Sequence, residues 1–179
     1  VKAAFGNLSA VLAGDYLLAK AMLLLSHPAD HAIFQEMLRT TAAMSEGELM
    51  QGAVGLSHCG NRDNAKQTTR LPWYDSPTAQ YLDIITRKTA MLMRSCCVAG
   101  ALSVNATPEQ VESLSAFGLH FGILFQLRDD LIDGENAELA QSLLPTYSQL
   151  ASKALEGFAP SEIRDALREL TRFCTQRES

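Results

Sequence analysis

Helical periodicity runs through almost the whole chain and constrains the fold more than any other feature. Good helix formers are abundant, and alternating strand patterns are scarce. The spacing predicts helices near residues 2–25, 29–57, 78–104, 108–133, 135–157 and 160–176. With 179 residues, 47% of them hydrophobic, the chain can bury a substantial core. We therefore expect one all-α domain that spans residues 1–179.

Two helix starts carry recognisable capping residues. Thr107 precedes Pro108, and Gln110 follows three residues after the threonine, which is the pattern of a capping box with proline in the first turn. Ser76-Pro77 is a similar start without the glutamine. Both sites predict helices that begin sharply.

Charge and cysteine content exclude several classes of protein. The net charge of −5 and the absence of a long basic run argue against a nucleic-acid partner. The four cysteines form no Cys-x-x-Cys pair, which argues against zinc and favours a reduced, cytoplasmic setting. The most apolar stretch, residues 16–25, is interrupted by Lys20, and we expect no stretch long enough to span a membrane.

The segment from Phe125 to Asp133 places three carboxylates and an amide at the end of an apolar helix. Asp129 and Asp133 share a helix face, Asp130 is their neighbour, and Gln126 lies one turn back. Hard oxygen ligands favour Mg²⁺, which leaves positions for water and phosphate. A solvated acidic helix end is the alternative, although carboxylates there oppose the helix dipole.

Lys88 and Thr89 lie side by side in the middle of another apolar helix. Lysine binds phosphate as a point charge, and threonine adds a hydrogen-bond donor. Taken alone, Lys88 is better explained as a lysine that extends from the edge of the core to solvent. A facing carboxylate cluster that holds Mg²⁺ would favour phosphate binding.

Three other polar residues lie within apolar helices. Asp15 is interpreted as a buried structural aspartate that needs a partner. Glu48 and Gln51 face either a polar cavity or solvent.

Internal glycines, including Gly118 and Gly122, are interpreted first as sites of close helix packing, and second as space for a ligand.

The junction after the acidic segment is unusually short. A helical pattern resumes almost directly after Asp133-Gly134, whereas helix–helix connections usually take about 2–8 residues. We expect that residues are missing around Gly134-Glu135. A mass of 19.5 kDa for the intact polypeptide would contradict this expectation.

Four segments, in order, resemble the trans-isoprenyl diphosphate synthase (polyprenyl synthetase) family. They are residues 10–21 (AVLAGDYLLAKA), 46–48 (EGE), 81–92 (YLDIITRKTAML) and 125–133 (FQLRDDLID). The resemblance implies antiparallel helices around a central cavity, the isoprenoid synthase type of fold, in a homodimer or a heteromeric synthase. It implies Mg²⁺-dependent condensation of isopentenyl diphosphate with an allylic diphosphate, and membrane contact through the polyprenyl product.

The resemblance also implies roles for individual residues. Asp129, Asp130 and Asp133 match the second aspartate-rich motif and would bind the metal, with Asp129 and Lys88 in catalysis. Lys88, Thr89 and Gln126 match ligands of the allylic diphosphate. The family's first aspartate-rich motif lies upstream of the Gly-Asp-Tyr segment, so the domain is expected to be incomplete before Val1.

Two functions follow from this pattern. The first is a prenyltransferase that makes a polyprenyl diphosphate, provided that the first aspartate-rich motif is present in the full protein. The second is a non-catalytic or regulatory subunit of a heteromeric prenyl diphosphate synthase. A terpene cyclase relative, or a helical scaffold with a fortuitous acidic end, is a third reading of the same residues.

Overall fold

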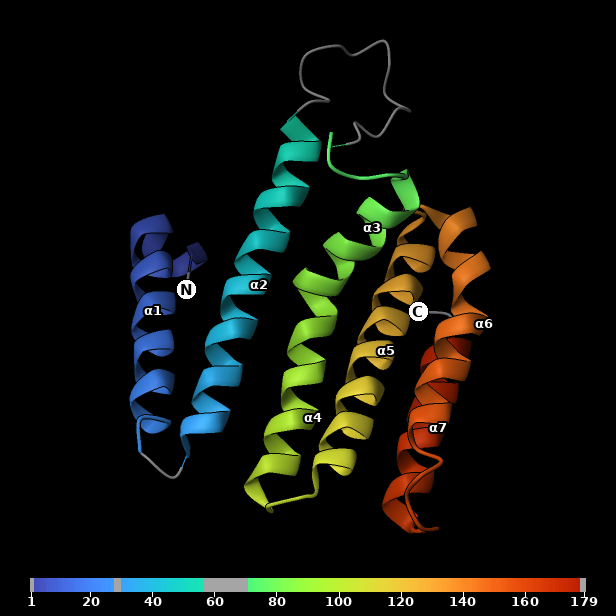
Figure 1. The fold of residues 1–179 in the computed structure, drawn as a ribbon. Coiled ribbons are helices and arrows are strands. Elements are labelled where there is room, and N and C mark those ends of the chain that lie inside the picture. Colours follow the sequence, from blue (N-terminus) through green and yellow to red (C-terminus); the bar gives the residue numbers. More distant parts are fainter. Residues whose placement is uncertain (1, 28–29, 57–70, 178–179) are drawn as a thin grey trace.

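The computed structural model describes residues 2–27, 30–56 and 71–177, and these contain helices and turns but no strand. In order, the helices are α1 (Lys2–Leu24), α2 (His31–Leu56), α3 (Pro77–Ile85), the π-helical turn η3 (Thr86–Ala90), α4 (Met91–Ser103), α5 (Pro108–Asp133), α6 (Ala137–Ala154) and α7 (Glu162–Gln176). Successive long helices run antiparallel, and the termini lie on opposite sides of the bundle (Figure 1). The predicted all-α fold is confirmed.

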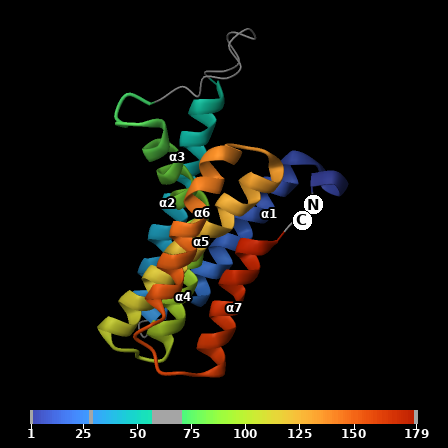
Figure 2. The same cartoon turned by 90° about the vertical axis from the view of Figure 1, so that its right-hand side faces the viewer.

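Helix α5 is the centre of the bundle. It packs against α4 on one side and α6 on the other, and it also contacts η3 and α7 (Figure 2). The expected capping box is present: the Thr107 hydroxyl accepts from the Gln110 backbone N–H, and the Gln110 side chain accepts from the Thr107 N–H. Ser76 caps α3 in the same way, through the backbone N–H of Ala79.

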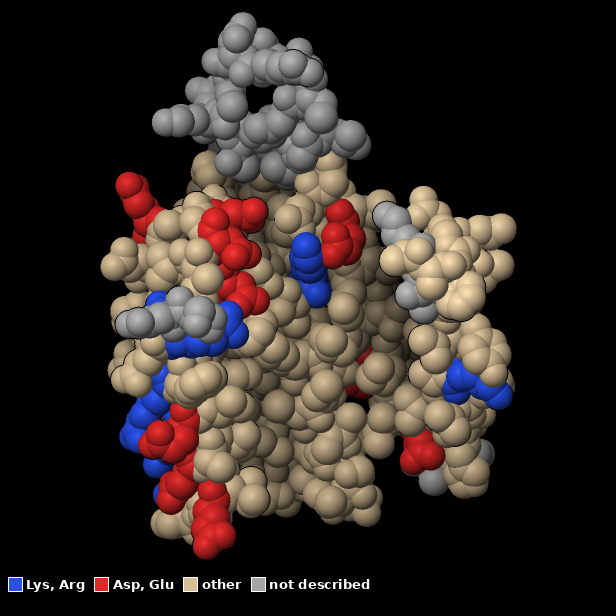
Figure 3. All heavy atoms as spheres, turned by 180° about the vertical axis from the view of Figure 1, so that it is seen from behind, with Lys and Arg blue, Asp and Glu red and all other residues tan. Residues whose placement is uncertain are grey.

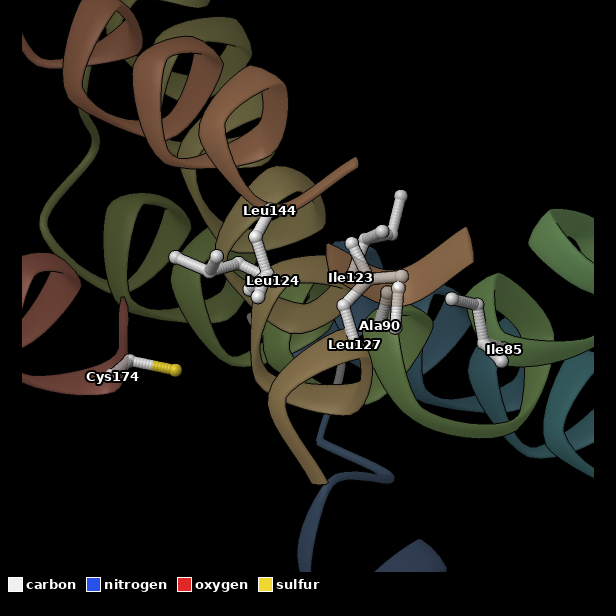
Figure 4. Close-up of a cluster of buried hydrophobic side chains, with 8 residues drawn as sticks. Ile85, Ala90, Ile123, Leu124, Leu127, Leu144 and Cys174 are labelled. Atoms are coloured by element: carbon white, nitrogen blue, oxygen red, sulfur yellow. The ribbon is translucent and has the colours of Figure 1, made fainter. Parts of the chain in front are cut away.

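The core is built around the middle of α5. Leu124 and Leu127 are fully buried, and Ile123 lies beside them against Ala90 of η3 (Figure 4). Each buried leucine or isoleucine side chain stabilises the fold by about 1.5–3 kcal/mol relative to exposure. The same cluster takes in residues from α3, α6 and α7, namely Ile85, Ala140, Leu144 and Cys174. This packing fixes α5 relative to η3.

The structure divides the helix expected over residues 78–104. It begins as α3, widens into the π-helical turn η3 and continues as α4. A single i→i+5 turn shifts the buried positions by only about one residue, which is too short an interruption for periodicity over a long helix to reveal. The π turn holds Lys88 and Thr89, two of the candidate site residues.

The glycines of α5 permit close helix packing, as the first interpretation expected. A Cβ atom on Gly118 would lie 2.7 Å from the Arg94 Cα, and one on Gly122 would lie 2.5 Å from the Ala90 Cα. Both distances are too short for a real contact, so the neighbouring backbones occupy the space that a side chain would take. The alternative, space cleared for a ligand, is wrong for these two positions.

Helix α1 differs from the others because it lies at the edge of the bundle, beside α2 alone (Figure 1). No described residue of α1 is buried. Asp15 is therefore exposed, and its interpretation as a buried aspartate is wrong within this chain. Seen from behind, α1 presents a largely uncharged surface, while charged side chains gather over α6 and α7 (Figure 3).

The length of α1 corrects a second expectation. Residues Ala3–Leu24 form a helix that is long and apolar enough to cross a membrane, by length and composition. Lys20 does not shorten it, because Asp15 and Lys20 are the two charged residues of Ala3–Leu24 and leave the average hydropathy of the window high. Soluble core helices and signal sequences pass the same test.

The turn between α5 and α6 takes three residues. Gly134 ends α5 with φ 74°, and Asn136 precedes α6 with φ 46°, both left-handed. The backbone N–H of Glu135 donates to the Asp130 carbonyl at 2.7 Å and closes the turn. Left-handed backbone at a non-glycine residue such as Asn136 is uncommon. The expectation that residues are missing at this turn stays a prediction.

Candidate functional site

A cavity of about 400 Å³ lies where the end of α5 meets α2, α3 and η3. Its wall combines an apolar part, with Ile84, Ile85 and Leu139, and a charged part. The charged residues that line it in the described chain are Lys88, Asp130, Asp133 and Glu135. Three carboxylates against one ammonium give the cavity a negative field, which attracts cations.

Asp130 is the most buried carboxylate of the cavity, with 8% of its surface exposed. The Tyr81 hydroxyl donates to Asp130 Oδ2 at 2.5 Å, and Gln126 Nε2 donates to Oδ1 at 2.8 Å. Burial, and then the hydrogen bond to Asp130, raise the pKa of Tyr81 far above its ordinary value. The tyrosine therefore stays protonated and donates, which holds the carboxylate in place.

Gln126 has its partners inside the protein. Its Oε1 accepts from the Thr89 hydroxyl at 2.7 Å, while its Nε2 donates to Asp130. A chain of donors thus runs from Thr89 on η3 through Gln126 to Asp130. Gln126 lines the cavity, but Thr89 is not among the residues that do. The Thr89 hydroxyl therefore acts on the cavity through Gln126 in this structure.

Lys88 reaches the cavity from the other side. Its Nζ donates to Gln51 Oε1 at 2.8 Å and lies 3.3 Å from Glu48 Oε1. The Lys88 side chain is 36% exposed and the Glu48 side chain 62% exposed, so the pair lies where the cavity meets solvent. The sequence left open whether Glu48 and Gln51 face a polar cavity or solvent. In the structure Gln51 lines the cavity and Glu48 does not.

Asp129 faces a different neighbour. Its carboxylate forms an ion pair with the Arg177 guanidinium, just beyond the end of α7. The Arg177 group also lies over the Phe125 ring, 5.4 Å from its centroid, and its carbonyl accepts from the Arg128 side chain. Asp129 is not among the residues that line the cavity, whereas Asp130 and Asp133 are. The structure thus separates the three aspartates into two environments.

The oxygen donors of the cavity fit one side of a magnesium site. Mg²⁺ is typically held by one or two carboxylates together with phosphate oxygens and water. Asp130 and Asp133 supply two such carboxylates, and each oxygen of Asp130 keeps a second lone pair beyond its hydrogen bond. Within the described residues no three His, Cys, Asp or Glu side chains are grouped closely enough to hold a metal by themselves.

Two residues of this region were not predicted from the sequence. Tyr81 lies seven residues before Lys88, two helical turns away, so the helical spacing contained a signal for it. Arg177 lies 48 residues after Asp129, and only the packing of α6 and α7 brings it there. No local pattern could have identified Arg177.

The sequence that forms most of these helices matches a known family. The family described as Polyprenyl synthetase matches residues 1–141 of the chain. The chain belongs to this family. The match covers α1 to α5 and the first residues of α6, and so includes the whole of the cavity lining described above.

Two individual members of the family are at least 30% identical to this chain over the matched residues. The farnesyl diphosphate synthase of Bacillus subtilis is 35% identical over 135 residues, which are 75% of this chain and 43% of that protein. The protein named heptaprenyl diphosphate synthase component 2 from Geobacillus stearothermophilus is 30% identical over 138 residues, 77% of this chain and 38% of its own length. The matched part of the chain covers less than half the length of these relatives.

Solved structures of the family share the fold. A polyprenyl synthase from Caulobacter crescentus, complexed with calcium and isoprenyl diphosphate, superimposes with a TM-score of 0.79. It is 22% identical, and the superposition covers 99% of this chain and 69% of that one. The helical bundle expected from the sequence resemblance is therefore confirmed.

Proposed function

We propose that this protein is a Mg²⁺-dependent prenyltransferase that condenses isopentenyl diphosphate with an allylic diphosphate to give a polyprenyl diphosphate. One observation carries the proposal. Lys88 of η3 lines the same cavity as Gln126, Asp130 and Asp133 of α5. A cation beside carboxylates and an amide is the set of groups that a metal-bound diphosphate requires.

The residues would act on the diphosphate in different ways. Lys88 would bind the diphosphate oxygens and offset the charge that develops on them as the allylic C–O bond breaks. Gln126 would orient the diphosphate, with Thr89 fixing its amide. Asp130 and Asp133 would hold Mg²⁺, which neutralises the leaving group when bound. Asp129 is proposed as a third ligand, on the condition that it exchanges Arg177 for the metal.

The apolar wall would protect the reacting carbon atoms. Ile84, Ile85 and Leu139 line the cavity next to the charged groups. An allylic cation that forms there is shielded from capture by water. The new C–C bond joins it to isopentenyl diphosphate, and the departing diphosphate takes the proton that this product loses.

The alternative is a non-catalytic or regulatory subunit of a heteromeric synthase. A relative named as component 2 of a heptaprenyl diphosphate synthase favours it. So does the arrangement of the cavity, where the described residues give carboxylates on one side only. In this alternative another chain supplies the facing side.

We also propose that the protein works as a homodimer or in a heteromeric synthase. The support is α1, whose large apolar side chains are exposed on an edge of the bundle, as with Phe5, Leu8 and Leu17. A cytoplasmic location is proposed because Cys96, Cys97 and Cys174 carry free thiols. Contact with a membrane would come through the polyprenyl product.

The test is an assay of the complete protein with isopentenyl diphosphate, Mg²⁺ and allylic primers of several lengths, with products identified by mass. Elongated products that disappear with a chelator support the enzyme. Mg²⁺-dependent binding of allylic diphosphate without elongation supports the subunit. A chain that neither binds nor elongates these substrates would overturn both.

A further inference from the structure

The π-helical turn η3 is an unusual element in an unusual place. Its i→i+5 geometry is rare, since well under 1% of residues adopt it. Such turns occur mostly as single insertions in α-helices, frequently at functional sites. Here the sequence Thr-Arg-Lys-Thr-Ala contains neither glycine nor proline. The contacts that neighbouring helices make with the turn can therefore set its geometry.

Two glycines press on this turn from neighbouring helices. A Cβ on Gly47 of α2 would lie 2.8 Å from the Lys88 backbone nitrogen and 3.2 Å from the Lys88 Cα. A Cβ on Gly122 of α5 would lie 2.5 Å from the Ala90 Cα. The obstructing atoms are backbone atoms, which no rotamer change can move. Each helix therefore touches the turn directly at its glycine.

The side chains of the turn show what this contact achieves. Lys88, beside Gly47, extends along α2 to Gln51 and into the cavity lining. Thr89, before Ala90, donates to Gln126, which lies four residues after Gly122 on α5. Two consecutive residues thus contact two different helices on the two sides of the turn. A shift of the backbone at Lys88 or Ala90 would move both contacts.

We infer that Gly47 and Gly122 are positioning residues that hold η3 in place and thereby set Lys88 and Thr89 for diphosphate binding. The inference rests on the proposed function, because it takes Lys88 to be a diphosphate ligand. Neither glycine touches the cavity, so both act only through the turn. A displacement of about 1 Å at a binding group can cost about 100-fold in function.

The experiment compares alanine variants of the full chain. Gly47→Ala and Gly122→Ala test the inference. Gly118→Ala is the matched control, because its Cβ meets backbone as closely, 2.7 Å from the Arg94 Cα, but on α4. Gly52→Ala is the second control, since it lies on α2 and a Cβ there meets nothing within 4 Å.

Each variant is titrated with inorganic diphosphate in the presence of Mg²⁺, and its melting temperature is recorded. The dissociation constant should rise about 10- to 100-fold for Gly47→Ala and Gly122→Ala. Gly118→Ala should lose thermal stability to a similar extent, yet keep its dissociation constant within about twofold. A rise for Gly118→Ala as large as for the other two would overturn the inference, as would unchanged affinity in both test variants.

Amide hydrogen exchange separates this inference from the proposed function. Exchange of the amides of residues 86–91 in the free chain should be faster in Gly47→Ala and Gly122→Ala than in Gly118→Ala. If the unaltered chain binds no diphosphate, the proposed function fails, and equal exchange in all three variants would also remove the positioning role. If Gly122→Ala does not fold, Gly47→Ala decides the outcome.

Discussion

Helices α5 and α1 have similar lengths and α1 is the more apolar of the two, yet α5 is the one that is buried. α5 has 26 residues, eight of them buried, and it packs against helices on several sides. α1 has 23 residues, and none that the structure describes is buried. The more apolar helix is therefore the exposed one within this chain, and the less apolar helix forms the core. Apolar helical periodicity predicts that a helix has a face to bury, but not which helix or which partner chain buries it.

The largest expected difference is in stability. Leu124 on α5 is fully buried, whereas Leu17 on α1 is 67% exposed. Leu124→Ala should lower the free energy of unfolding by about 2–5 kcal/mol, because it removes core contacts and leaves a cavity. Leu17→Ala should change it by less than about 0.5 kcal/mol. Urea denaturation measures both, and equal losses would show that α1 is covered in solution.

The next difference concerns two lysines. Lys88 lines the cavity, while Lys20 on α1 lies over the Tyr16 ring, 5.8 Å from its centroid. Lys88→Ala should weaken Mg²⁺-dependent binding of an allylic diphosphate by about 10- to 100-fold, because a charge-assisted contact is lost. Lys20→Ala is the control and should bind as the unaltered chain does. Calorimetry checks both, and an unaltered dissociation constant for Lys88→Ala would reject its assignment.

A charge placed on α1 tests whether the exposed apolar side chains of this helix form an interface with another chain. Leu17→Lys should leave the fold intact and weaken self-association or partner binding by about tenfold, because a charge resists burial in an interface. Sedimentation over a range of protein concentrations measures the effect. Glu138→Lys, on an exposed position of α6, is the control. Association that is unchanged by Leu17→Lys would show that α1 does not form the interface.

The smallest expected effect is a pH dependence on α5. Burial lowers the pKa of His120, and its Nδ1 is buried without a hydrogen-bond partner among the described residues. The unfolded chain then binds a proton more readily than the folded one, so the free energy of unfolding should fall as the pH drops below about 6.5. His120→Gln should flatten this dependence, while His31→Gln, exposed at the start of α2, should not. Denaturation at pH 7 and pH 5 compares the variants.

Capping residues predicted the starts of helices well, whereas helical periodicity did not reveal the geometry of individual turns. The Thr107 capping box and the Ser76-Pro77 start appear in the structure as expected. The helix over residues 78–104 was right in extent, but its π turn was not foreseen. Side-chain periodicity reports which face is buried, whereas the turn itself packs closely against Gly47 and Gly122 of other helices.

The candidate site was predicted in the same partial way. Lys88, Gln126, Asp130 and Asp133 do line one cavity. Thr89 belongs to the site through Gln126, and Asp129 pairs with Arg177 instead of facing the cavity. The hydrogen bond from Tyr81 to Asp130 and the ion pair of Arg177 with Asp129 appear only in the structure, since residues 48–49 positions apart meet through packing.

The sequence by itself determined that the chain is helical, which residues begin its helices, and which polar groups are available for a metal-bound diphosphate. These properties are local, because capping and helix faces depend on residues within one or two turns. Tertiary structure decided which carboxylate faces the cavity, how η3 is wound, and that α1 stays uncovered within this chain. These depend on contacts between helices far apart in the sequence, where a glycine or an arginine acts on a partner that no local pattern identifies.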